Sequence, residues 1–112
     1  MTPEEFEQKI AWIESLLKRD GARVRWNHKI PDPDNPEQKR QIDVTIQRGN
    51  KLTLVECRYH SKSQDVKWVE ELYGRRVSLN AYSVIAVSAS GFTKGAIKKA
   101  EKLGVVLRYP RS

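Results

Sequence analysis

The stretch IDVTIQRGNKLTLVECRYH, residues 42–60, decides the fold. It contains two runs rich in β-branched and other apolar residues, and Gly49-Asn50 lies between them. A two-residue Gly-Asn connection is typical of a type II′ β-hairpin. The stretch therefore predicts two antiparallel strands, over residues 40–48 and 51–59.

The turn also sets the pairing of the two strands. A two-residue turn pairs Arg48 with Lys51, and counting back along both strands places Asp43 directly opposite Glu56. Opposed residues have Cβ atoms roughly 5 Å apart. Two carboxylates at that distance repel by about 3 kcal/mol at an effective dielectric constant of 20. The hairpin thus places charge where stability alone would not favour it.

The two faces of the hairpin differ in character. One face carries the opposed acids, and Arg58 follows Glu56 by two residues on that same face. We expect the opposite face to form the main core, through Ile42, Val44, Ile46, Thr53, Val55 and Cys57.

A bound divalent cation converts the repulsion between the acids into coordination. Mg²⁺ commonly takes one or two carboxylates and completes its shell with water and substrate phosphate. Arg58 can then hold phosphate or stabilise charge in the transition state, which suits metal-assisted phosphodiester hydrolysis. The alternative is a surface cluster in which Arg58 neutralises Asp43 and Glu56.

The rest of the chain adds helices and strands around the hairpin. Cap residues are expected at Thr2, Asp65, Thr93 and Gly104. Apolar periodicity predicts three helices, which span about residues 3–20, begin after Asp65, and span residues 94–103. It also predicts three further strands, over residues 22–30, 82–89 and 105–109. The order αβββαβαβ predicts a single α/β domain over residues 1–112, with a mixed sheet flanked by helices.

Composition limits the class of protein. The 112 residues are 38% hydrophobic and 31% charged, and no apolar run approaches the length of a membrane span. Cys57 is the only cysteine, which excludes an internal disulfide and a cysteine-rich zinc site. These features are those expected of a soluble cytoplasmic protein.

The net charge of +7 is unevenly distributed. Residues 1–37 have a balance of −2, whereas residues 38–112 have a balance of +9. Such a basic region favours a nucleic-acid partner. The alternative is a small basic protein whose charge only keeps it soluble.

Four segments carry a resemblance to a known family. They are RQIDVTI, LVECRYH, DVKWVEELYGRR and VIAVSASGFTKGAIKKAEKLGVVLR, within about residues 22–109. The chain resembles the PD-(D/E)xK nuclease superfamily, and within it the Mrr-type restriction endonuclease catalytic domain. The resemblance implies a restriction endonuclease-like three-layer core.

The resemblance also implies roles for particular residues. Asp43 and Glu56 match the metal-binding acids, and the carbonyl group of Cys57 would be a further ligand of Mg²⁺ or Mn²⁺. Glu7 is the best match to an acid that many members carry on the first helix, and Glu14 is the second. Arg58 stands where the signature has lysine, and an arginine cannot lose its proton to activate water.

Further residues are candidates for contact with DNA. Gln64 and Lys67 lie near a position that supports the metal or phosphate in related nucleases, although a solvated helix start explains them equally well. Lys62 and Lys94 are further basic candidates, although a solvated helix face is the more common explanation of Lys94. His60 could act as a base, but a surface position at the end of a strand is the favoured explanation. Trp68 lies off the apolar stripe of its helix and is a candidate for base stacking, although a tryptophan in a small domain is more often part of the core.

The sequence therefore supports three functions. The first is a metal-dependent DNA endonuclease in which Asp43, Glu56, Arg58 and Glu7 carry the chemistry, and double-strand cleavage then favours a homodimer. The second is a non-catalytic nucleic-acid-binding module on the same fold. The third is a protein-interaction domain whose charge is incidental.

Overall fold

The computed structural model describes residues 1–17 and 21–109, without the side chains of residues 14–17. Within these residues the elements are α1 (Pro3–Leu17), β1 (Arg23–Pro31), β2 (Lys39–Arg48), β3 (Lys51–Arg58), α2 (Val66–Ser78), β4 (Ser83–Ser88), α3 (Lys94–Leu103) and β5 (Val106–Arg108). This is the predicted order αβββαβαβ. The end of the predicted first helix, at residues 18–20, lies outside the described residues.

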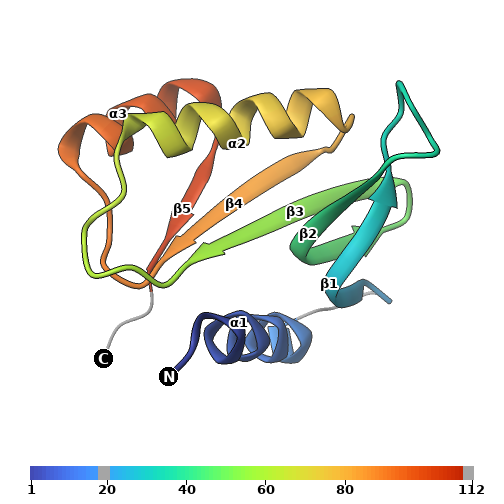
Figure 1. Ribbon diagram of the computed structural model, residues 1–112, viewed down its shortest axis with the longest axis horizontal. Coiled ribbons are helices and arrows are strands. Elements are labelled where there is room, and N and C mark those ends of the chain that lie inside the picture. The colour runs from blue at the N-terminus through green and yellow to red at the C-terminus, as the bar shows by residue number, and fades with distance from the viewer. Residues whose placement is uncertain (18–20, 110–112) are drawn as a thin grey trace.

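A mixed sheet forms the middle layer of the molecule (Figure 1). In the described part of the chain it has five strands, in the order β1-β2-β3-β4-β5. The first three strands form an antiparallel meander, and β4 and β5 run parallel to β3. Helices α2 and α3 cover one face, while α1 covers the other face over β1 to β3 (Figure 1). The predicted three-layer α/β class is therefore confirmed.

All three helices begin where the sequence predicts, and α3 also ends there. Thr2 Oγ1 accepts a hydrogen bond from the N–H of Glu5 at 3.1 Å. Asp65 caps α2 and Thr93 caps α3 in the same way, each through its side-chain oxygen. Gly104 ends α3 with a φ of 73°, a left-handed conformation that glycine adopts without steric cost. These bonds satisfy N–H groups that a helix start leaves without partners.

The hairpin has the predicted register. Arg48 pairs with Lys51, and Gly49 has a φ of 60°, as the first central position of a type II′ turn requires. The ladder between β2 and β3 continues back to the pair Val44–Val55. The acids Asp43 and Glu56 therefore occupy the next position, just beyond the last ladder pair.

The position of the main core differs from the prediction. Among the described residues, the larger hydrophobic cluster lies between the sheet and helices α2 and α3, and it includes Leu54 and Ile42. Val44 and Val55 instead pack under α1 in the smaller cluster. The predicted core face is thus the minor one, because two helices cover the opposite side of the sheet.

Ile42 and Val44 lie in different clusters although they are two residues apart. Side chains two apart on a regular strand share a face, so the strand departs from regular geometry around Asp43. On the neighbouring β1, Asn27 has a left-handed φ of 54°. The residue before it pairs with Val44, and the residue after it pairs with Ile42. The irregular backbone of both strands therefore coincides with the acidic position.

Strand β4 is buried from Val84 to Ser88, as its apolar run predicts for a strand covered on both faces.

No helix among residues 1–17 and 21–109 is long and apolar enough to cross a membrane.

We predict that Leu54→Ala destabilises the protein much more than Ile97→Ala does. Leu54 is 0% exposed in the larger cluster, whereas Ile97 on α3 is 50% exposed. Truncation of a buried leucine costs about 2–5 kcal/mol, and a surface change costs within about 0.5 kcal/mol. Urea denaturation of both variants measures the difference. Similar midpoints would contradict the assignment of the main core to the face under α2 and α3.

Candidate active site

Asp43 and Glu56 meet at the point where the β2–β3 ladder ends. The N–H of Asp43 donates to Oε1 of Glu56 at 3.1 Å, and the N–H of Cys57 donates to Oδ2 of Asp43 at 2.9 Å. Each carboxylate thus accepts a hydrogen bond from the backbone of the opposite strand. These crossed hydrogen bonds fix both acids relative to the sheet.

Glu56 is the more buried acid of the pair. Its side chain is 9% exposed, and its Oε2 accepts a hydrogen bond from the guanidinium of Arg75 on α2. Burial, followed by the negative charges of Asp43 and Glu7, raises the pKa of Glu56 to about 7, against the opposing effect of Arg75 and the Asp43 N–H. Burial is therefore the main cause of the raised pKa, and the charge of Arg75 offsets it only in part.

The pKa values of Asp43 and Glu7 are raised as well. Burial raises the pKa of Asp43, while the Cys57 N–H and Arg75 oppose that rise. Burial, followed by the charge of Asp43, raises the pKa of Glu7 on α1. The structure therefore brings Glu7 within electrostatic range of the paired acids. The side chain of Glu14, the other first-helix candidate, lies outside the described residues.

The donor set around Asp43 and Glu56 suits Mg²⁺ or Mn²⁺. Among the described side chains, no group of three or more His, Cys, Asp and Glu residues lies close enough together to hold a metal, so Glu7 does not complete such a set. Mg²⁺ needs only one or two carboxylates beside water and phosphate. In the part of the chain described, Oδ1 of Asp43 accepts no hydrogen bond, so this oxygen is open to a ligand.

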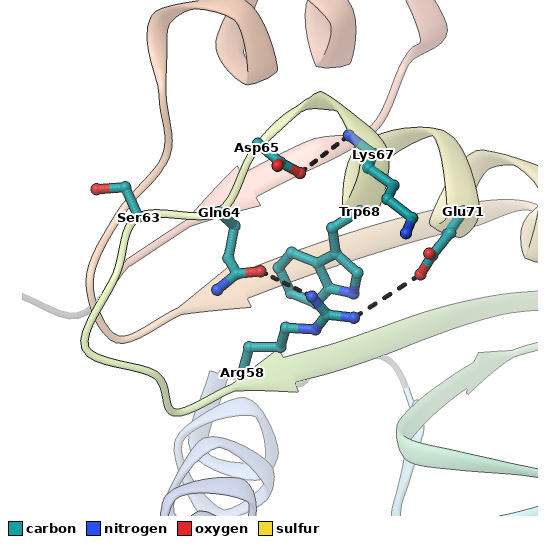
Figure 2. Close-up of a pocket in the computed structure, with 7 residues that line it drawn as sticks. All are labelled: Arg58, Ser63, Gln64, Asp65, Lys67, Trp68 and Glu71. Atoms are coloured by element: carbon teal, nitrogen blue, oxygen red, sulfur yellow. Dashed lines mark hydrogen bonds and ion pairs between the residues drawn. The ribbon is translucent and has the colours of Figure 1, made fainter.

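Arg58 bonds to groups other than the two acids. Its Nη1 donates to Oε1 of Gln64 at 2.8 Å, and its Nη2 lies 3.7 Å from Oε2 of Glu71. Its guanidinium carbon also lies 4.8 Å from the centre of the Trp68 ring (Figure 2). The alternative in which Arg58 neutralises Asp43 and Glu56 is therefore wrong, because α2 supplies closer partners.

These partners of Arg58 belong to a cavity of about 220 Å³ beside the end of β3 (Figure 2). Its lining residues are Arg58, Ser63, Gln64, Asp65, Lys67, Trp68 and Glu71. The cavity is polar and carries charges of both signs.

Gln64 has a structural role beside this cavity. It is 6% exposed, and its backbone bonds to Gly91 and Thr93 tie the segment before α2 to the segment before α3. Its side chain accepts from Arg58 and donates to the carbonyl of Lys62 at 3.3 Å. Gln64 therefore positions Arg58 and presents little surface to solvent.

Of the two interpretations of Trp68, the core one is confirmed and base stacking is wrong. Its side chain is 4% exposed and stacks on Phe92 with ring centres 6.1 Å apart. The basic candidates Lys62, Lys67 and Lys94 are exposed, and so is His60. Their side chains are thus free to meet a large polyanion, which a buried tryptophan cannot do.

Sequence reasoning missed Arg75. It follows the buried Leu72 by three residues, and this spacing places both side chains on one face of a helix. That face of α2 packs on the sheet, which brings the guanidinium to Glu56. The spacing was visible in the sequence, but it does not say which strand residue the arginine meets.

Comparison with known proteins supports this account of the fold. The family model Mrr_cat, described as restriction endonuclease, matches residues 1–108. A search of the curated proteins found no match.

Three solved structures are similar to the chain. A protein of unknown function, AF1548, has a TM-score of 0.74 and 18% identity, over 92% of this chain and 57% of that one. Can2 from Sulfobacillus thermosulfidooxidans, in complex with cyclic tetra-adenylate, has a TM-score of 0.71 and 16% identity, over 92% and 32%. The DNA modification-dependent restriction endonuclease AspBHI has a TM-score of 0.60 and 20% identity, over 95% and 28%. At these identities the likeness shows the fold alone, and the chain spans less than two thirds of each protein.

We predict that Glu56→Gln stabilises the protein at neutral and alkaline pH. The folded pKa of Glu56 is raised from 4.5 to about 7. Between these values the unfolded chain releases a proton that the folded protein keeps, so stability falls as pH rises. Glutamine removes this loss, which amounts to at most about 3 kcal/mol.

Urea denaturation in EDTA measures the effect. We expect the variant to exceed the wild type at about pH 8 and to match it at about pH 4.5. An equal difference at both pH values would contradict the raised pKa.

Proposed function

Since the chain belongs to the Mrr-type restriction endonuclease catalytic-domain family, we propose that it hydrolyses phosphodiester bonds in DNA with the help of a divalent metal ion. The observation that carries this proposal is the crossed pair formed by Asp43 and Glu56 at the end of the ladder. Burial raises the pKa of both acids, and the charge of Asp43 raises that of Glu56 further, so the pair is unfavourable for stability. Such a pair is useful where a cation and a phosphate must be bound.

Asp43, Glu56 and the carbonyl oxygen of Cys57 would hold Mg²⁺ or Mn²⁺. The ion would lower the pKa of an attacking water and offset the charge of the phosphate. The crossed hydrogen bonds keep both carboxylates in place before substrate arrives. Such preorganisation avoids rearrangement during the reaction.

The residues around the metal position have separate roles. Glu7 on α1 lies within electrostatic range of the acids, and we assign its carboxylate to orienting water. Arg58 cannot act as the base that a signature lysine can provide, because an arginine keeps its proton. We assign Arg58 to phosphate binding, with its guanidinium held in place by Gln64 and Glu71.

Exposed lysines would hold the DNA backbone. Lys62 and Lys67 lie just before and at the start of α2, and Lys94 begins α3. These positions belong to the basic part of the chain, where residues 38–112 have a balance of +9. Contacts of this kind position a duplex without reading its sequence. Cleavage of both strands would need two sites, which a homodimer supplies.

A non-catalytic DNA-binding module is the second candidate. Two observations favour it: Arg75 already partners Glu56, and Arg58, which stands in place of the lysine, bonds to Gln64 instead of the acids. Such a module would bind DNA through its basic surface without a requirement for metal.

Plasmid cleavage separates the two functions. We expect the wild type to nick supercoiled plasmid in Mg²⁺ or Mn²⁺ and not in EDTA. Asp43→Asn and Glu56→Gln should each lower the rate by at least about 10²-fold, because each removes a charged ligand. Arg48→Gln, at the turn end of β2, is the matched control. Retained DNA binding with no nicking in either metal would favour the binding module.

DNA affinity measured against salt tests the lysines. We expect the triple variant Lys62→Gln, Lys67→Gln and Lys94→Gln to bind duplex DNA more weakly and with less salt dependence. The slope of log affinity against log salt should fall by about 0.9 for each phosphate contact removed. Lys51→Gln, in the distant hairpin turn, should leave the slope unchanged. An unaltered slope in the triple variant would remove these lysines from the DNA surface.

A further inference from the structure

Arg75 is placed as a counter-ion of the acid pair. It lies on the face of α2 that packs on the sheet, three residues after the buried Leu72. Its Nη1 donates to Oε2 of Glu56, and its charge also acts on Asp43. The positive charge nearest the acids thus comes from a helix rather than from the two strands that carry them.

Arg58 does not share this task. Its guanidinium is engaged by Gln64, Glu71 and the ring of Trp68. Within the described side chains, Arg75 is the arginine whose guanidinium bonds to Glu56. The two arginines therefore have different partners. Arg58 lines the cavity beside β3, and Arg75 bonds to Glu56.

A metal ion and Arg75 would compete for Glu56. Oε1 of Glu56 is used by the Asp43 N–H, and Oε2 is used by Arg75. A cation that approaches this carboxylate meets a guanidinium of like charge on the same oxygen. Arg75 can move away, because its side chain is 33% exposed and is joined to the helix by a flexible stem.

We infer that Arg75 is the resident counter-ion of Asp43 and Glu56, that a divalent cation displaces it from Glu56, and that the displaced guanidinium binds the substrate phosphate. A guanidinium matches phosphate through paired N–H groups. The inference rests on the proposed function, because it concerns the same metal and phosphate. It assigns to Arg75 part of the role that the signature lysine would have at position 58.

Titration calorimetry with Mn²⁺ alone tests the competition. Arg75→Gln removes the competing charge, and we expect it to bind Mn²⁺ about tenfold more tightly than the wild type. Arg75→Lys keeps the charge and should stay near the wild-type affinity. Arg48→Gln removes an equal charge at the far end of β2 and should also leave the affinity unchanged.

Plasmid cleavage at saturating Mn²⁺ tests the phosphate contact. We expect Arg75→Gln to cleave about 10²-fold more slowly despite its tighter metal binding, and Arg75→Lys to recover part of the rate. If Arg75 and Glu56 formed only a structural ion pair, Arg75→Gln would not bind Mn²⁺ more tightly and at the same time cleave more slowly. If Arg75→Gln does not fold, Arg75→Met keeps the aliphatic stem beside Leu72 and carries the same test.

The outcomes separate this inference from the proposed function. If the wild type binds Mn²⁺ and cleaves, equal or weaker Mn²⁺ binding by Arg75→Gln overturns the competition while the nuclease proposal stands. Tighter binding with an unchanged rate overturns the phosphate contact. Absence of Mn²⁺ binding in both the wild type and Arg75→Gln overturns the inference and the proposed function together.

Discussion

Where β2 and β3 separate, the carboxylates of Asp43 and Glu56 accept the hydrogen bonds of the opposite strands. The N–H of Asp43 bonds to Glu56, and the N–H of Cys57 bonds to Asp43. A backbone N–H that is shielded from water needs an acceptor, and here the acceptors are charged side chains. The end of the ladder and the candidate active site are therefore the same structure. Raised pKa values at both acids are the consequence of burying those charges.

Helix α2 organises the charge around this point. Its inward face supplies Trp68 and Leu72 to the larger core and Arg75 to Glu56. Gln64, just before this helix, and Glu71, within it, bind the guanidinium of Arg58. The docking of one helix thus decides where two arginines point, and so decides the electrostatics of the site.

Proteins with different descriptions share this fold, so the fold alone does not identify the chemistry of the site. The similar solved proteins are 16–20% identical to the chain and include a protein of unknown function as well as a restriction endonuclease. Function resides in a site rather than in a fold. In this chain the site combines an arginine at position 58 that lines a cavity with a second arginine that bonds to Glu56.

The sequence by itself determined the order of the elements, the helix caps, the hairpin register and the meeting of Asp43 with Glu56. All of these depend on local features, such as a two-residue turn, a capping side chain or an apolar period. Only the tertiary structure decided which sheet face carries the larger core, that Trp68 is buried, and that Arg75 rather than Arg58 reaches Glu56. The reason is that these outcomes depend on how helices far along the chain are rotated and seated on the sheet. Long side chains then take whichever partners that packing brings within reach.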